Sequence, residues 1–141
     1  MKRLRILLVE DNPDDVKITQ RTLKKGNLKD ELFVVKDGQE ALDFLNQRGQ
    51  HQGTPRPDLI FLDLNLPKVS GLEVLEQIKK SPAHRRIPVI VLTVSRREED
   101  RIRAYDSGAS SYIQKPASSS EFIRAINTVR DYWEMAELPP E

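Results

Sequence analysis

The hydrophobic residues of the chain fall into short runs that alternate with longer stretches of helical periodicity. The clearest run, Leu59 to Leu62, has no polar residue, so both faces of the strand that it predicts should be covered. The predicted strands span residues 4–9, 31–35, 58–62, 88–92 and 111–113, and the predicted helices span residues 14–25, 38–48, 71–80, 97–107 and 118–134. Five such alternations are typical of β-α-β units with right-handed crossovers. The sequence therefore predicts an α/β fold, a doubly wound parallel sheet of five strands with helices on both faces.

Turn-forming residues bound several of these elements. Pro13 suits the first turn of a helix, and Gly26 suits a helix end. The segment from Gln47 to Pro57 is rich in Gly, Gln, His and Pro, which predicts a loop before the third strand. This loop is longer than a typical connection between a helix and a strand.

The predicted strands end on polar residues whose side chains can react or bind ligands. Asp63 directly follows the apolar run of the third strand. The first strand stops on Glu10 and Asp11, the fourth stops on Thr93, and the fifth stops on Gln114, Lys115 and Pro116. Open parallel sheets hold their ligands at the carboxyl ends of the strands. We therefore expect acids, a hydroxyl and a lysine to meet at one edge of the sheet.

Length and charge exclude several classes of protein. A chain of 141 residues has the length of one domain, residues 1–141, without room for an output domain. Its 23 basic and 22 acidic side chains give a net charge of +1, so no overall field draws it to nucleic acid or to a membrane. The absence of cysteine excludes disulfides and thiolate metal sites. The apolar runs are far shorter than the roughly 20 residues of a membrane span, so a cytoplasmic protein is expected.

The order of these polar groups resembles that in the receiver domains of two-component response regulators. The motifs are Glu10-Asp11, Asp63 with Pro67 and Gly71 after it, Thr93, and Lys115-Pro116, and the similarity covers about residues 4–133. The resemblance implies a flavodoxin-like strand order, 2-1-3-4-5. It also implies a single-domain response regulator in phosphorelay signal transduction, which accepts a phosphoryl group on Asp63 from a sensor histidine kinase. Such a protein catalyses only its own phosphorylation and dephosphorylation and is otherwise no enzyme.

Phosphorylation of a carboxylate requires a hard cation and a positive side chain, because negative charge in the transition state must be neutralised. By resemblance, Asp11 and Asp63 would bind Mg²⁺ directly, and Glu10 would bind it directly or through water. The main-chain carbonyl of Asn65 would complete the protein ligands, and Mn²⁺ can substitute for Mg²⁺. Lys115 would pair with Asp63 before transfer and with a phosphoryl oxygen afterwards.

Glu10 departs from the family pattern, in which both members of the acid pair are commonly Asp. The extra methylene lengthens the reach of the side chain and keeps its charge, so we expect metal binding with altered geometry. Either acid motif alone would more often be a helix cap or a turn. Only the combination with Thr93 and Lys115 indicates a phosphorylation site.

The resemblance also implies a conformational switch. Thr93 would donate its hydroxyl to the new phosphoryl group and move toward it, and the ring of Tyr112 would turn into the vacated space. This would remodel the surface of the fourth helix, fifth strand and fifth helix. In this family the peptide bond before Pro116 is typically cis, which aims Lys115 inward. The alternative is that Tyr112 is an ordinary half-buried strand aromatic.

Three other classes of function fit the sequence less well. A phosphohydrolase of the haloacid-dehalogenase type needs a second acid two positions after Asp63, where this chain has Asn65. A nucleotide-binding protein needs a glycine-rich first loop, but residues 10–15 are acidic and would repel phosphates. A receiver-like interaction module that is never phosphorylated stays open.

The output of the protein is expected to be a contact with a downstream protein. Among receivers, the long loop before the third strand, the stretch from Leu62 to Pro67 and the pair Tyr132-Trp133 most resemble the stand-alone regulators paired with phytochrome-type histidine kinases. The alternative is that the downstream partner is a motor protein, as in chemotaxis.

The last predicted helix has an unusually wide apolar surface. It carries Phe122, Ile126, Val129 and Trp133 at helical spacing, with Ile123 and Tyr132 beside them. This width predicts a homodimer through the fourth helix, fifth strand and fifth helix. The alternative is that the extra aromatic residues merely cover the edge of the sheet.

Overall fold

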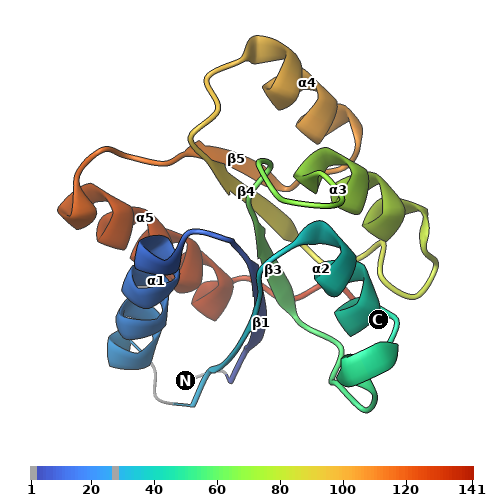
Figure 1. The fold of residues 1–141 in the computed structure, drawn as a ribbon. Coiled ribbons are helices and arrows are strands. Elements are labelled where there is room, and N and C mark those ends of the chain that lie inside the picture. The colour runs from blue at the N-terminus through green and yellow to red at the C-terminus, as the bar shows by residue number, and fades with distance from the viewer. Residues whose placement is uncertain (1–2, 27–28) are drawn as a thin grey trace.

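A five-stranded parallel sheet lies between two layers of helices (Figure 1). The computed structural model describes residues 3–26 and 29–141. The strands are β1 (Arg5–Val9), β2 (Glu31–Val35), β3 (Leu59–Leu62), β4 (Val89–Thr93) and β5 (Ser111–Gln114), in the order β2-β1-β3-β4-β5. The helices are α1 (Pro13–Gly26), α2 (Gly38–Leu45), α3 (Gly71–Lys80), α4 (Glu98–Asp106) and α5 (Ser119–Met135). The predicted doubly wound, flavodoxin-like fold is confirmed.

The sheet divides the apolar side chains into two cores. In β3, Ile60 and Leu62 pack with residues of α2 and α3, whereas Leu59 and Phe61 pack with residues of α1 and α5. Because both faces are covered, all four positions are apolar and at most 1% exposed. In the described ranges, no helix is long and apolar enough to cross a bilayer.

The observed elements lie within one residue of the predicted bounds except between α2 and β3. There α2 ends at Leu45 rather than at residue 48, and Gln47 takes a positive φ of 56°. The following segment is not an irregular loop throughout, since it contains the 3-10 turn η1 (Gly49–His51). The Thr54 hydroxyl fixes this turn by donating to the carbonyl of Phe44 at 2.8 Å. A single turn held by side chains leaves no hydrophobic periodicity in the sequence, which is why it was missed.

Two glycines allow the segment after β3 to lie against α2 and α3. A Cβ at Gly71 would sit 2.2 Å from the carbonyl oxygen of Asp63, and a Cβ at Gly38 would sit 1.9 Å from the carbonyl oxygen of Val69. Both distances are far below van der Waals contact, and both obstacles are backbone atoms. The close approach therefore fixes the path of the chain directly after Asp63.

Gly38→Ala is expected to lower the free energy of unfolding by about 1–3 kcal/mol, because the added methyl group must displace backbone. Urea unfolding followed by circular dichroism measures this change. Gly26→Ala is the matched control, since its Cβ would meet nothing closer than 3.9 Å. That variant should be as stable as the parent or slightly more stable, because Ala favours helix. Equal stability of the two variants would contradict the steric argument.

Candidate functional site

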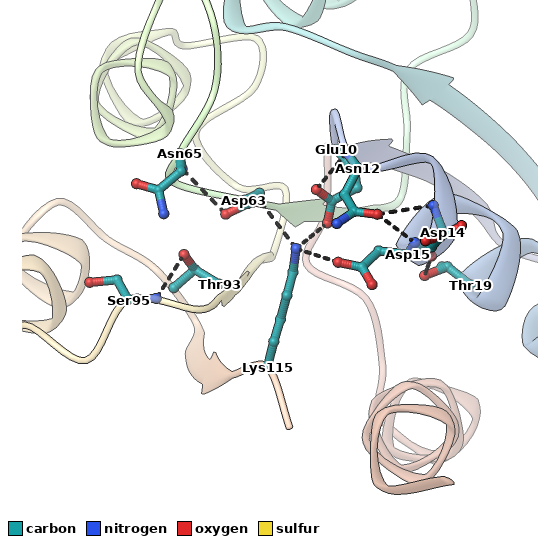
Figure 2. Close-up of polar contacts among 10 residues, drawn as sticks. All are labelled: Glu10, Asn12, Asp14, Asp15, Thr19, Asp63, Asn65, Thr93, Ser95 and Lys115. Atoms are coloured by element: carbon teal, nitrogen blue, oxygen red, sulfur yellow. Dashed lines mark hydrogen bonds and ion pairs between the residues drawn. The ribbon is translucent and has the colours of Figure 1, made fainter. Parts of the chain in front are cut away.

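The polar residues at the strand ends meet at the carboxyl edge of the sheet (Figure 2). Asp63 follows β3 and is 6% exposed, and its N–H donates to the carbonyl of Val9 at 3.1 Å. Glu10 follows β1 and is also buried. Lys115 follows β5, and its N–H donates to the carbonyl of Thr93 at 2.7 Å. The sheet's hydrogen bonds therefore continue past the strands and fix the backbone of the site.

One ammonium group joins three carboxylates at the centre of this edge. The Nζ atom of Lys115 donates to Oε1 of Glu10 at 2.5 Å, to Oδ2 of Asp15 at 2.9 Å and to Oδ2 of Asp63 at 3.1 Å. The side chains of Lys115, Glu10 and Asp63 are each at most 6% exposed, while that of Asp15 is 19% exposed. An ammonium group has three N–H donors, so all of them are used.

Burial and charge shift the protonation equilibria in this cluster. Burial raises the pKa of Glu10 to about 7; the Asp63 charge adds to this rise, and the hydrogen bond from Lys115 opposes it. Burial alone would lower the pKa of Lys115, but its hydrogen bonds to Glu10 and Asp15 and the charge of Asp63 outweigh burial and raise that pKa. The lysine is therefore firmly charged and holds the acids together.

Three carboxylates of the edge are placed to share a divalent cation. Oxygen atoms of Glu10, Asp11 and Asp63 all lie within 4.8 Å of one another. Asp11 is exposed to solvent, and the backbone N–H of Asn65 donates to Oδ1 of Asp63 at 3.3 Å. Oxygen ligands on one open side fit Mg²⁺ or Mn²⁺, since such ions keep several waters and need few carboxylates. The residues present therefore fit a divalent cation.

On the other side of Asp63, Thr93 and Tyr112 are connected through Ser95. The Thr93 hydroxyl, fully buried, accepts from the N–H of Ser95 at 3.4 Å. The Tyr112 hydroxyl donates to the carbonyl of Ser95 at 3.4 Å, and the Ser95 hydroxyl donates to Asp100 in α4 at 2.6 Å. The N–H of Tyr112 in turn donates to the hydroxyl of Tyr105 at 3.1 Å. The two predicted switch residues thus lie in one network that includes both ends of α4.

Residues 6–127 match the profile of the response regulator receiver domain. The chain belongs to the response regulator receiver family. It is 42% identical over 135 residues to response regulator Rcp1 of Synechocystis sp., a match that covers 95% of this chain and 92% of Rcp1. It is 41% identical over 130 residues to the probable methanogenesis regulatory protein FilR2 of Methanothrix harundinacea, covering 91% of this chain and 82% of FilR2. The protein is therefore a component of two-component signalling.

Solved structures of similar receivers share the whole fold. The phosphorylated cyanobacterial phytochrome response regulator RcpA superposes with a TM-score of 0.94 at 41% identity, covering 99% of this chain and 100% of that one. The Mn²⁺-bound form of Rcp1 superposes with a TM-score of 0.93 at 40% identity, covering 97% and 99% of the two chains. A bound divalent cation in so similar a receiver agrees with the carboxylate cluster described above.

The expectation of a cis peptide bond before Pro116 was wrong for this receiver. The described residues contain no cis peptide bond, so the bond between Lys115 and Pro116 is trans. The lysine nevertheless points inward, because its backbone N–H is tied to the carbonyl of Thr93 and its Nζ atom reaches Asp63. The continued sheet ladder directs the side chain without a cis bond.

The sequence interpretation missed Asp15, which contacts Lys115. It also missed Ser95 and Tyr105, which belong to the network around Thr93 and Tyr112. One signal could have identified Asp15, because it precedes the buried Thr19 by four positions and so lies on the sheet-facing side of α1. Asp14 next to it is exposed. Helical phase thus distinguishes two acids that composition alone treats as equal.

Lys115→Met is expected to lower the free energy of unfolding by about 3 kcal/mol without divalent cations, because three carboxylates lose their counter-charge. Millimolar Mg²⁺ should restore part of this loss, since a cation replaces the missing charge. Urea unfolding with Mg²⁺ and with EDTA measures both effects. The exposed Lys17→Met is the control and should change little in either condition. An equal loss with and without Mg²⁺ would show that the cation and the lysine do not serve the same acids.

Proposed function

We propose that this receiver accepts a phosphoryl group on Asp63 from a sensor histidine kinase and transmits the signal by a change in its surface. The observation that carries the proposal is the contact of the buried Asp63 carboxylate with the Lys115 ammonium, beside two further acids that can share a cation. The receiver would promote only its own phosphorylation and dephosphorylation, and a protein target downstream would recognise the changed surface.

In the transfer step, a carboxylate oxygen of Asp63 attacks the phosphorus atom of a phosphohistidine. The new O–P bond forms as the N–P bond breaks, and the imidazole leaves with the electron pair of that bond. Lys115 neutralises charge on the phosphoryl oxygens, and the hydroxyl of Thr93 donates to one of them. Glu10, Asp11, Asp63 and the main-chain carbonyl of Asn65 would hold Mg²⁺, with Mn²⁺ as a substitute. The bound ion supplies further positive charge at the phosphoryl oxygens.

The switch follows from the position of Thr93. When its hydroxyl turns toward a phosphoryl oxygen, it no longer accepts from the N–H of Ser95. Ser95 then becomes free to move together with its partners Tyr112 and Asp100, so that both β5 and the start of α4 are affected. This is a shift between two packings, favoured by the contacts that only the phosphoryl group makes.

The similarity to RcpA, a cyanobacterial phytochrome response regulator, supports a phytochrome-type kinase as the partner. The match over 92% of response regulator Rcp1 likewise supports a response regulator as the role of this receiver. We place this signalling in the cytoplasm, where the kinase domains of two-component sensors work.

Asp63→Asn should abolish labelling by acetyl phosphate with Mg²⁺, because the amide is no phosphoryl acceptor. The intact mass of the wild-type protein should increase by one phosphoryl group, and that of the variant should not. Asp14→Asn is the control, since it removes a nearby acid outside the cluster. Comparable labelling of Asp63→Asn and wild type would exclude Asp63 as the acceptor.

We further propose a homodimer through α4, β5 and α5. The apolar stripe of α5 is largely used inside the monomer, because Phe122 and Ile126 are buried and Val129 and Trp133 pack on the same core. Exposed apolar side chains on or next to these elements include Tyr132 on α5, Tyr105 and Ile102 on α4, and Val94 directly after β4, which are 48–61% exposed. Apolar exposure of this extent supports a second copy as the partner.

Tyr132→Ala should weaken the dimer, and a phosphoryl mimic should change its dissociation constant, because the remodelled surface is buried in it. Sedimentation velocity at micromolar concentration, with and without beryllofluoride, measures both. Ile123→Ala is the matched control, since Ile123 lies on the other side of α5, beside Ile18 and Arg21 of α1. A monomer under both conditions would refute the dimer.

A further inference from the structure

Asp15 differs from the other two carboxylates that contact Lys115. Glu10 and Asp63 belong to the cluster that can share a cation, together with Asp11, whereas Asp15 does not. Its Oδ2 atom nevertheless lies 2.9 Å from the Nζ atom of Lys115, closer than that of Asp63 at 3.1 Å. The site therefore contains one acid that serves the lysine alone.

The first turn of α1 fixes the position of Asp15. The side-chain oxygen of Asn12 accepts from the N–H of Asp14 at 2.9 Å and from the N–H of Asp15 at 3.2 Å. The carbonyl of Asp15 accepts from the hydroxyl of Thr19 at 2.8 Å. Its carboxylate thus projects from a capped helix start toward Lys115 (Figure 2).

A cation and Lys115 would engage the same two carboxylates, those of Glu10 and Asp63. Oε1 of Glu10 and Oδ2 of Asp63 accept from Lys115, and the second oxygens of these carboxylates accept from the N–H groups of Asn12 and Asn65. A cation that binds Glu10 and Asp63 neutralises the negative charge that attracts the ammonium group, and its own positive charge repels that group. Asp15 then becomes the only carboxylate among the described contacts of Lys115 that the cation does not engage.

We propose that Asp15 is a positioning residue that holds Lys115 while Glu10 and Asp63 bind the divalent cation. The proposal rests on the function proposed for Asp63 and deepens it. By taking over the lysine, Asp15 lets the cation bind without expelling the positive group that the phosphoryl oxygens need. It contributes more to the cation-bound state than to the free state, and so raises the affinity for the cation.

Mn²⁺ binding to the full chain, measured by electron paramagnetic resonance of the free ion, tests this proposal. Asp15→Asn should raise the dissociation constant for Mn²⁺ about tenfold, the equivalent of one charge-assisted hydrogen bond. Asp14→Asn removes the same charge one residue away, at an exposed position, and should change the constant by less than about threefold. Asp15→Glu, which keeps the charge, should recover part of the affinity.

A double-mutant cycle separates this role from a general charge effect. In a Lys115→Gln background there is no ammonium group to hold, so Asp15→Asn should affect Mn²⁺ binding no more than Asp14→Asn does. Thermal unfolding in EDTA identifies any variant that has lost the fold. If Asp15→Asn is such a variant, the Mn²⁺ affinity of Asp15→Glu relative to wild type decides the test. Wild-type binding with equal effects of Asp14→Asn and Asp15→Asn would overturn the role of Asp15 and leave the proposed function intact. A wild type that binds no Mn²⁺ would overturn the cation site itself.

Discussion

The contact between one lysine and three carboxylates organises the functional edge of this receiver. Glu10, Asp15 and Asp63 come from the ends of two strands and the start of a helix, and all three converge on Lys115 within 3.1 Å. Without the ammonium group, these acids would repel one another in a site that is largely shielded from water. With it, the site keeps concentrated negative charge that a cation can use, and a positive group that the proposed phosphoryl transfer would require.

Such a cluster requires a rigid backbone that holds the charged side chains in place. The hydrogen bonds from Asp63 to Val9 and from Lys115 to Thr93 carry the sheet's order beyond the last strand residues. The glycines at positions 38 and 71 then let α2 and α3 approach the segment after Asp63 so closely that a methyl group would collide with a carbonyl oxygen. The positions of the charged side chains therefore depend on close packing at the two glycines. In this sense the glycines are part of the site, although they have no functional side chain.

The sequence predicted those parts of the molecule that arise from repeated patterns. Apolar runs such as Leu59 to Leu62 located the strands, because a strand covered on both faces admits no polar residue, and their ends located Asp63 and Lys115. Features that depend on a single contact were not predictable in the same way. The η1 turn depends on the Thr54 hydroxyl, and the inward direction of Lys115 depends on one backbone bond rather than on the expected cis bond. To predict the contact between Asp15 and Lys115, one would have needed both the phase of the helix and the reach of the lysine side chain.

The contacts around Ser95 are the route by which the proposed phosphorylation of Asp63 would affect the surface. The bond from Ser95 to Thr93 and the bond from Tyr112 to Ser95 are both long, at 3.4 Å, so little energy is lost when they break. The bond from Ser95 to Asp100 is short, at 2.6 Å, so Ser95 and the start of α4 should move as one unit. Only Ala104 of α4 is fully buried, which leaves this helix weakly held against the body of the receiver. In the proposed switch, release of Thr93 would therefore act on the weakly held α4 through the shortest of these contacts, so that a rearrangement of a few hydrogen bonds could change a whole face of the molecule.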